Sequence, residues 1–494
     1  MISGLSELAK FTGLPCRPQL HTLFDLERVA KIDSYPKLCY PMRTLILIFL
    51  IAITPSVFAQ ELTSNRQQDI VFRSVNVIPM DRERVLENQT VIVRNGRITA
   101  MGNEAKVRFG KDALVVDAKG KYLIPGWAEM HAHVPPNEDI ESMKDVLTLY
   151  LVNGITTIRG MLGHPKHLEL RSKINSGEIL GPHFYTTGPS FNGQTVKTAE
   201  RGAEMVREQK AAGYDYLKLH PGLTKETFPA IARTAQEVGI PFVGHVSFNV
   251  GVWRAIDARY STIDHLDGFI EAITPGIDTL VEQETGLFGS WIAYRADAAQ
   301  IPKLVNGLRD KRVYVVPTQA LAERWLSPMP GETFTRDPEM KYMKPQEVQN
   351  WVNAKTSYMS NPNFSKEHAD KLIQIRRKLI YECQKNGVQL LLGSDAPQVF
   401  NVPGFSIHHE MKYMVDAGLT PYETLRTGTA NVAAYLKKSD SGVIKVGNVS
   451  DLVLLSGNPL KDISQTRNID GVMIGLNWLS KAYSEQALKK LEKN

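Results

Sequence analysis

The sequence predicts an α/β protein: a parallel (β/α)8 barrel of the TIM type with a small β-sandwich domain formed from both chain ends. Within residues 124–439, eight short apolar runs alternate with amphipathic stretches, and polar residues gather where the apolar runs end. Short alternating runs with turn residues flank this region on both sides. Repeated strand-helix units favour a parallel barrel, and such barrels place their active sites at the carboxyl ends of the strands.

The flanking segments 60–123 and 440–480 are expected to form the composite β-sandwich domain. In the first segment, Thr90–Val93 and Arg97–Ala100 alternate on either side of the pair Asn95-Gly96, which is a strong hairpin signal. Similar runs recur near the end of the chain, so one small domain would enclose the barrel. Residues 481–494 are expected to be a C-terminal tail.

Eight strands and several helices are expected inside residues 124–439. The segment 323–365, rich in Pro, Met and aromatic residues, is expected to be an insertion over the barrel mouth, either a lid or a packing element. The expected strands are 124–133, 155–160, 183–189, 216–220, 241–246, 262–267, 313–318 and 390–395, and the clearest helical patterns are 199–212, 225–238, 365–386 and 421–436.

Residues 1–59 are expected to be a leader that includes a signal peptide at 42–59. Met42-Arg43 gives a positive start, 45–53 is continuously apolar, and small residues precede Gln60. This pattern predicts a secreted or periplasmic protein whose synthesis starts at Met42, with residues 1–41 an upstream misreading of the gene. The apolar run is short for a membrane span, so no stable anchor is expected, although an uncleaved anchor is the alternative.

Composition narrows the expected partners. The net charge is +6 without a dense basic run, which argues against nucleic acid. The apolar share of 43% and the charged share of 22% are those of an ordinary globular protein. Cys383 would be the only cysteine of a chain cut before Gln60, so no internal disulfide is expected. We expect a small-molecule or short peptide substrate, and a homo-oligomer is left open.

Side chains at the predicted strand ends are candidate metal ligands. His131 and His133 are two residues apart on one strand and therefore share a face, and paired imidazoles suit zinc. Lys218 lies inside an apolar strand, where an unpaired ammonium tends to lose its proton. The neutral amine could react with carbon dioxide to give an anionic carbamate; the alternative is a lysine paired with a carboxylate. The other strand-end candidates are His245, His265 and Asp395.

Taken in order, these motifs resemble the metal-ligand motifs of the metal-dependent amidohydrolase superfamily. The likeness covers residues 69–480 and is strongest to the imidazolonepropionase-like and prolidase-like branch with a carboxylated lysine. The segments that carry it are 126–133, 216–220, 244–245, 264–267 and 393–396, with boundary motifs at 124–126 and 445–453.

The resemblance implies two divalent metal ions, zinc being expected, although manganese, cobalt or iron suit similar ligands. His131, His133 and Asp395 would hold one ion, His245 and His265 the other, and Lys218 as N6-carboxylysine would bridge them. A metal-bridging hydroxide would then be the nucleophile, and Asp395 would be the catalytic proton shuttle.

The implied activity is hydrolysis of a carbon–nitrogen (amide or peptide) bond, in a dipeptide or an N-acyl amino acid. A lactonase, a cyclic amidase or a phosphotriesterase-like hydrolase could use the same binuclear site, because the same nucleophile attacks all these substrates. A non-catalytic, metal-stabilised binding protein is the alternative from another class. The loop residues around the site, rather than the metal ligands, determine which of these functions the chain has.

Three further residues are candidate substrate contacts. Arg159 ends the second predicted strand and could pair with a substrate carboxylate or form an internal salt bridge. Tyr216 and His220 share a face with Lys218, and they could reach substrate or simply fill the barrel. Structural roles are expected for His164, His167, His183 and Cys383, and a place outside the metal centre for His408 and His409.

Overall fold

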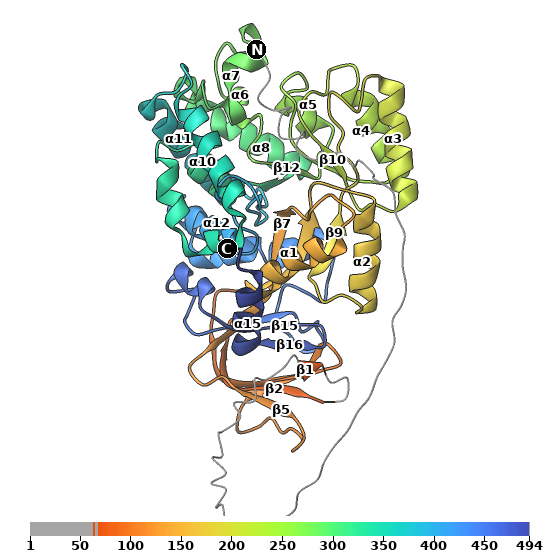
Figure 1. Cartoon of the computed structure of the whole chain (residues 1–494), viewed down its shortest axis with the longest axis vertical. Helices are drawn as coiled ribbons and strands as arrows, with labels where there is room; N and C mark the ends of the chain where they lie inside the picture. Colours follow the sequence, from red (N-terminus) through yellow and green to blue (C-terminus); the bar gives the residue numbers. More distant parts are fainter. Residues whose placement is uncertain (1–62, 65–67, 494) are drawn as a thin grey trace, which may run out of the picture. The chain divides into compact units, whose positions relative to one another are not determined.

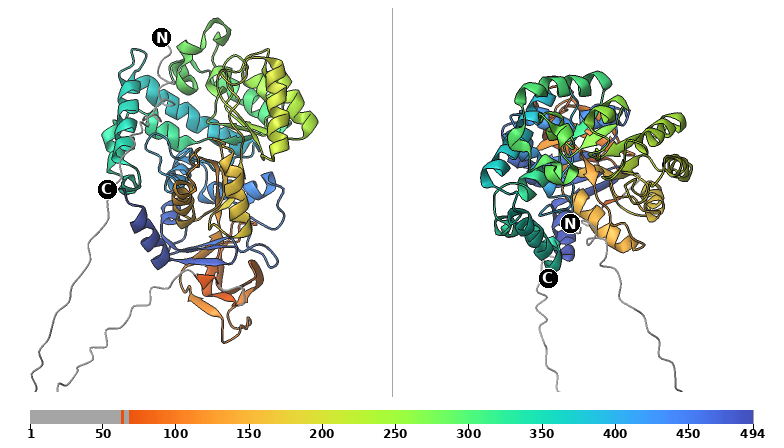
Figure 2. Two further views of the ribbon diagram at one scale, coloured as in Figure 1. Left: turned by 45° about the vertical axis from the view of Figure 1, so that its right-hand side comes forward. Right: turned by 90° about the horizontal axis from the view of Figure 1, so that it is seen from above.

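The computed structural model describes residues 63–64 and 68–493 (Figures 1 and 2). The predicted leader, with its signal peptide at 42–59 and the proposed start at Met42, lies outside the described residues. Among the helices of the described residues, none combines the length and the apolarity needed to cross a membrane. Cys383 is buried, which agrees with its expected structural role.

Both ends of the chain contribute to one nine-stranded sheet, with the order β1-β16-β15-β14-β6-β2-β3-β4 and β5 paired to β2. The predicted hairpin at Asn95-Gly96 joins β3 to β4, and both turn residues have positive φ, as a tight hairpin turn requires. The hydrogen bonds define a single sheet, so the two-layer sandwich stays a prediction. The strands are β1 (Thr63–Ser64), β2 (Ile70–Val77), β3 (Leu86–Arg94), β4 (Arg97–Asn103), β5 (Leu114–Asp117), β6 (Tyr122–Pro125), β14 (Leu452–Leu455), β15 (Ile469–Ile474) and β16 (Asn477–Ser480).

The middle of the chain forms two parallel sheets, with orders β7-β8-β9 and β10-β11-β12-β13. These seven strands fall within the predicted runs, and most are short. Their apolar residues are buried almost completely, as expected for parallel strands covered on both faces. The strands are β7 (Trp127–Ala132), β8 (Ile155–Gly160), β9 (His183–Thr186), β10 (Leu217–Leu219), β11 (Phe242–Gly244), β12 (Thr262–Asp264) and β13 (Tyr314–Val316).

Isolated bridges link the edges of the two parallel sheets. Thr187, just after β9, bridges Tyr216, just before β10. The predicted eighth strand is not a regular strand: Leu390 bridges Val315 of β13, and Ala396 bridges Ala132 of β7. The backbone also leaves the extended region at Asp395, which has φ +63 and lies between these two bridges. A continuous eight-stranded barrel therefore stays a prediction.

Helices cover the outside of the parallel sheets, as the view from above in Figure 2 shows. Helix α3 has the predicted bounds, with Thr198 accepting from Arg201 N at 3.2 Å at its start and Gly213 in the left-handed conformation at its end. The predicted helix 421–436 is two helices that separate around Gly428, where a Cβ would lie 2.7 Å from Leu392. The helices are α1 (Ile140–Val152), α2 (Lys166–Ser176), α3 (Ala199–Ala212), α4 (Phe228–Val238), α5 (Val252–Asp257), α6 (Phe269–Ala272), α7 (Glu282–Thr285), α8 (Ile301–Lys311), α9 (Gln319–Trp325), α10 (Pro345–Met359), α11 (Lys366–Lys385), α12 (Ser406–Asp416), α13 (Pro421–Thr427), α14 (Ala430–Tyr435) and α15 (Lys481–Leu491).

The predicted insertion 323–365 packs closely on the rest of the chain. Trp351 of α10 meets the ring of Phe400, just beyond Asp395, with centroids 6.1 Å apart. Arg324, at the start of the segment, is buried and donates from Nε to the carbonyl of Phe400 at 3.0 Å. The choice between a lid and a packing element stays a prediction. The predicted C-terminal tail contains helix α15, which contacts α1.

The junction between α1 and β8 generates a stability prediction. Gly154 has φ +81, and a Cβ there would lie 2.7 Å from Trp127 Cζ2. Gly154→Ala is expected to lower the free energy of unfolding by about 1–3 kcal/mol through this clash, in addition to a left-handed backbone penalty of about 1–2 kcal/mol. Urea denaturation followed by circular dichroism measures the loss.

Gly239→Ala is the matched control. Gly239 also follows a helix with positive φ, +66, but no atom lies within 4 Å of the added Cβ. This variant should show the backbone penalty alone. Equal losses in the two variants would mean that the Trp127 ring does not constrain the α1–β8 junction.

Candidate metal centre

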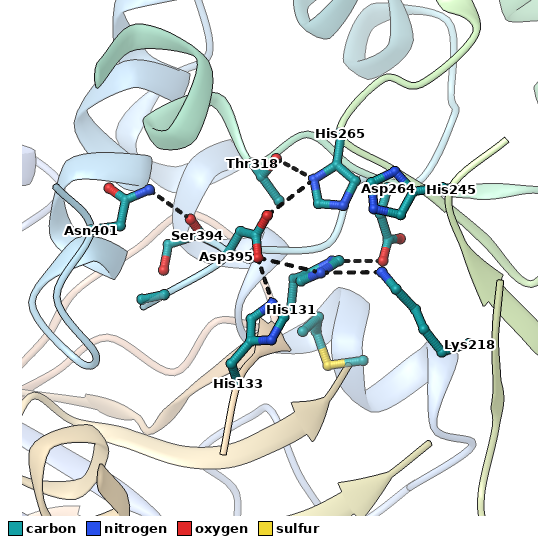
Figure 3. A network of polar contacts seen from close by, with 12 residues as sticks. His131, His133, Lys218, His245, Asp264, His265, Thr318, Ser394, Asp395 and Asn401 are labelled. Carbon is teal, nitrogen blue, oxygen red and sulfur yellow. Dashed lines mark hydrogen bonds and ion pairs between the residues drawn. The ribbon is translucent and has the colours of Figure 1, made fainter. Parts of the chain in front are cut away.

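The first group of candidate ligands joins β7 to the segment that follows Leu390 (Figure 3). His133 Nε2 lies 2.6 Å from Asp395 Oδ1, and His131 Nε2 lies 3.6 Å from the same oxygen. One ligand atom from each of the three residues falls within 4.8 Å of the others, which is close enough to hold one metal ion. Two imidazoles and a carboxylate form a donor set that suits zinc.

Two more imidazoles adjoin this group. The His265 ring lies 4.4 Å from the ring of His131 and 4.4 Å from the ring of His245, centroid to centroid. Burial lowers the pKa of all three rings, to about 3 for His245, so they are neutral, as metal ligation requires. Within the described part of the chain, His265 Nε2 is buried without a hydrogen-bond partner. Such a nitrogen is costly unless a ligand uses it.

Lys218 belongs to the same cluster. Its side chain is completely buried, and Nζ lies 3.4 Å from His131 Nε2 (Figure 3). Burial lowers the pKa of Lys218 to about 8, while the negative charges of Asp264 and Asp395 oppose that change. The neutral amine, which is the form that can be carboxylated, is therefore easier to reach than in an exposed lysine.

Neighbouring groups orient the candidate imidazoles through Nδ1. His131 Nδ1 donates to Asp264 Oδ2 at 2.8 Å, and His245 Nδ1 donates to Asp267 Oδ2 at 2.9 Å. His265 Nδ1 shares a hydrogen bond of 2.9 Å with Thr318 Oγ1. A partner on one ring nitrogen fixes the orientation of the ring and leaves the other nitrogen for a metal. The residues present therefore fit a metal centre.

Left-handed backbone conformations bring several of these side chains together. The φ angle is +64 at His265, +44 at Thr318 and +63 at Asp395. Each conformation ends the strand alternation, so that the consecutive residues Asp264 and His265 both contact the cluster. Residues other than glycine adopt such angles at a cost of about 1–3 kcal/mol each, and they concentrate at functional sites.

A buried carboxylate fastens the two backbones that carry the first ligand group. Glu129 Oε1 accepts from the backbone N–H of His131 at 3.1 Å and of Ser394 at 2.8 Å. The Ser394 hydroxyl donates to Glu129 Oε2 at 2.6 Å. Burial raises the pKa of Glu129 to about 8, and these hydrogen bonds oppose the rise. The position of Asp395 relative to His131 thus depends on Glu129.

The three candidate substrate contacts occupy different surroundings. Arg159 is completely buried and pairs with Asp264, so the internal salt bridge of the sequence prediction is formed. Tyr216 stacks on Tyr435 of α14 with centroids 6.1 Å apart. The ring of His220 stacks 5.1 Å from His245 and so lies beside the cluster. Contact of any of them with substrate stays a prediction.

The remaining histidines of the described residues lie outside the cluster. His167 and His183 have protein partners, Pro135 O at 3.0 Å and Asp451 Oδ2 at 2.9 Å, which agrees with structural roles. His409 lies with Asp337 and Glu339 in a second group close enough to hold an ion. Two arginines contact that group: Arg324 pairs with Asp337, and Arg467 lies 3.0 Å from the His409 ring nitrogens. The group is therefore a salt-bridge network.

Several supporting residues have no assigned role in the sequence prediction. They are Glu129, Asp264, Asp267, Thr318 and Tyr435. Asp264 offered a signal, because a carboxylate inside the apolar run 262–266 needs a buried cation, and Arg159 in 155–160 could supply one. Thr318 and Tyr435 gave none, since only tertiary packing brings them to the network.

Clustered histidines, a buried lysine and an aspartate at the ends of parallel strands form the kind of donor set that binds divalent metal ions in metal-dependent hydrolases. The Amidohydrolase family model matches residues 122–479, and the chain belongs to this family. An adenine deaminase from Clostridium botulinum is 27% identical over 196 residues, covering 36% of this chain and 33% of the deaminase. The chain thus spans about a third of that relative.

Two solved structures share the fold. A putative prolidase from Bifidobacterium longum aligns with a TM-score of 0.64 and 20% identity over 86% of this chain and 99% of its own. A bottromycin amidohydrolase aligns with a TM-score of 0.67 and 22% identity over 88% of this chain and 91% of its own. At these identities the likeness establishes the fold of the chain and leaves its substrate open.

The Glu129–Ser394 hydrogen bond generates a second stability prediction. Ser394→Ala removes the donor to Glu129 Oε2 and leaves a buried carboxylate oxygen without it. The free energy of unfolding should fall by about 1–3 kcal/mol, the cost of an unsatisfied buried polar group. Thermal and urea denaturation measure the loss.

Ser456→Ala removes a similar hydroxyl–carboxylate bond, 2.8 Å from Ser456 Oγ to Asp470 Oδ2, on the surface. Water can replace that donor, so the expected change is within about 0.5 kcal/mol. A loss as large as that of Ser394→Ala would show that burial does not set the strength of the Glu129 contact.

Proposed function

We propose that the chain hydrolyses an amide or peptide bond in a dipeptide or an N-acyl amino acid, at a centre of two divalent metal ions. The observation that carries the proposal is the convergence of four imidazoles, a buried lysine and one carboxylate, each from a predicted strand end. Cyclic amides, lactones and phosphotriesters are alternative substrates, because the ligand residues do not distinguish them.

The ligands divide into two groups according to the contacts above. His131, His133 and Asp395 would hold one ion, and His245 and His265 the other, with carboxylated Lys218 between them. Divalent ions in such a site lower the pKa of water and polarise a carbonyl oxygen. We also infer that the parallel sheets and the segment 389–396 close into the predicted barrel. The backbone hydrogen bonds from Leu391 N to Val315 O, 2.9 Å, and from Met130 N to Leu392 O, 2.8 Å, support this inference.

Asp395 is the proposed proton carrier. Its Oδ1 faces the imidazoles of His131 and His133, and its Oδ2 lies 3.5 Å from His265 Nδ1. The Asp395 residue is only 5% exposed, so little water competes for the hydrogen bonds of its carboxylate. In this position Asp395 can accept a proton at one oxygen and deliver it to a leaving nitrogen.

Metal content tests the role of Lys218. The wild-type chain, produced with zinc and bicarbonate available, should hold about two metal ions per chain. Lys218→Met should hold one or none, because the amine that would carry the bridging carbamate is gone. Inductively coupled plasma mass spectrometry on protein verified as folded gives the count.

Lys355→Met is the matched control, since Lys355 is equally buried but donates to backbone carbonyls in the insertion. The folded fraction of this variant should hold the same number of metal ions per chain as the wild type. One ion or fewer in both wild type and Lys218→Met would remove the lysine from the centre and favour a deaminase or a metal-stabilised binding protein.

A substrate panel tests the reaction. Dipeptides and N-acyl amino acids should be cleaved by the metal-loaded chain, and Asp395→Asn should lower kcat by about 10²–10⁴-fold through the loss of general acid–base catalysis. Adenine, cyclic amides and lactones serve as the competing arms. Ammonia release from adenine, without cleavage of any acyclic amide, would contradict the proposal.

A further inference from the structure

Arg159 is linked to His131 indirectly, by two routes. Its Nε donates to the backbone carbonyl of Met130, the residue before His131, at 2.8 Å. Its Nη2 lies 3.3 Å from Asp264 Oδ2, the oxygen that accepts from His131 Nδ1 at 2.8 Å. One guanidinium therefore contacts both the backbone that carries His131 and the carboxylate that orients its ring.

The surroundings of Arg159 hold it in this place. The side chain is fully buried, and Nη1 donates to the Tyr435 hydroxyl at 3.1 Å. Tyr435 in turn shares a hydrogen bond of 2.8 Å with Ser261 Oγ. The guanidinium carbon lies 5.5 Å from the Tyr216 ring centroid and 5.8 Å from the Tyr435 ring centroid. All three guanidinium nitrogens thus contact protein atoms.

We propose that Arg159 is a positioning residue for the metal centre, which sets the ring orientation of His131 by holding Asp264 and the carbonyl of Met130 together. The inference rests on the proposed function in one respect, the use of His131 as a metal ligand. It assigns Arg159 a role other than substrate binding. Lysine cannot replace arginine here, because a single ammonium cannot span the two acceptors in the planar geometry of a guanidinium.

Zinc affinity of the full chain is the test. The dissociation constant is measured per folded chain by competition with a chromophoric chelator. Arg159→Lys should weaken zinc binding about 10–100-fold, the usual effect of losing a partner that orients a ligand. Asp264→Asn should weaken it similarly. The double variant should lose much less than the product of the two single losses, because Arg159 acts largely through Asp264.

A spectroscopic measurement separates positioning from packing. Cobalt(II) in place of zinc reports ligand geometry through its visible absorption. Arg159→Lys should change this spectrum. Arg324→Lys is the matched control and should leave both the spectrum and the zinc affinity as in wild type, since the buried Arg324 pairs with Asp337 and donates to the carbonyl of Phe400, outside the metal centre.

Several results would overturn the inference. One is wild-type zinc affinity and cobalt spectrum in Arg159→Lys, and another is an equal loss in Arg324→Lys. Should Arg159→Lys not fold, Arg159→Gln is measured instead, and failure of both to fold assigns Arg159 to the stability of the fold. A wild type that binds metal without cleaving any substrate contradicts the proposed function alone. A wild type that binds no metal contradicts both.

Discussion

The carboxylate of Asp264 is the contact on which the centre depends. It accepts from the Thr262 hydroxyl at 2.6 Å and from His131 Nδ1 at 2.8 Å, and it pairs with Arg159 at 3.3 Å. Burial raises the pKa of Asp264, and the positive charges of Arg159 and Lys218 oppose that rise. A charge buried so completely is tolerable only when it is paired and hydrogen-bonded. The same network therefore satisfies buried polar groups between the parallel strands and orients the ring of His131, a candidate metal ligand.

Backbone conformation is the second constraint on the centre. Strands that stayed extended would send successive side chains to opposite faces, and Asp264 and His265 could not serve one cluster. Positive φ at His265, and again at Asp395, turns these side chains toward the cluster. The conformational penalty is offset by the neighbours that hold the turns, such as Arg376, which donates to the carbonyl of His265 at 2.7 Å.

The sequence was a good guide wherever a pattern was local. Apolar runs located the seven parallel strands, and the Asn95-Gly96 pair located a hairpin, because each depends on residues adjacent in the chain. The sequence predicted a regular eighth strand, whereas the structure has only isolated bridges there. An apolar run does not reveal the left-handed conformation at Asp395. The six proposed metal ligands lie in one cluster, yet their supports, such as the Thr318 hydroxyl, come from contacts that no local pattern encodes. Arg159 shows the same limit: its position was clear from the sequence, and its partners were not.

The composite sheet contributes to the centre as well as to the fold. Residues 122–132 run from β6, inside that sheet, directly into β7, which carries His131. Strand β14, from the far end of the chain, pairs with β6, and Gly126 N donates to Asp451 O at 2.8 Å at the junction. A Cβ on Gly126 would lie 2.3 Å from Thr156 Oγ1, so this crossing point leaves no room for a side chain. Residues more than three hundred positions away in sequence therefore help to fix the register of β7. That register sets the positions of His131 and His133 along the strand direction. Both ends of the chain therefore contribute to the position of the strand that carries His131.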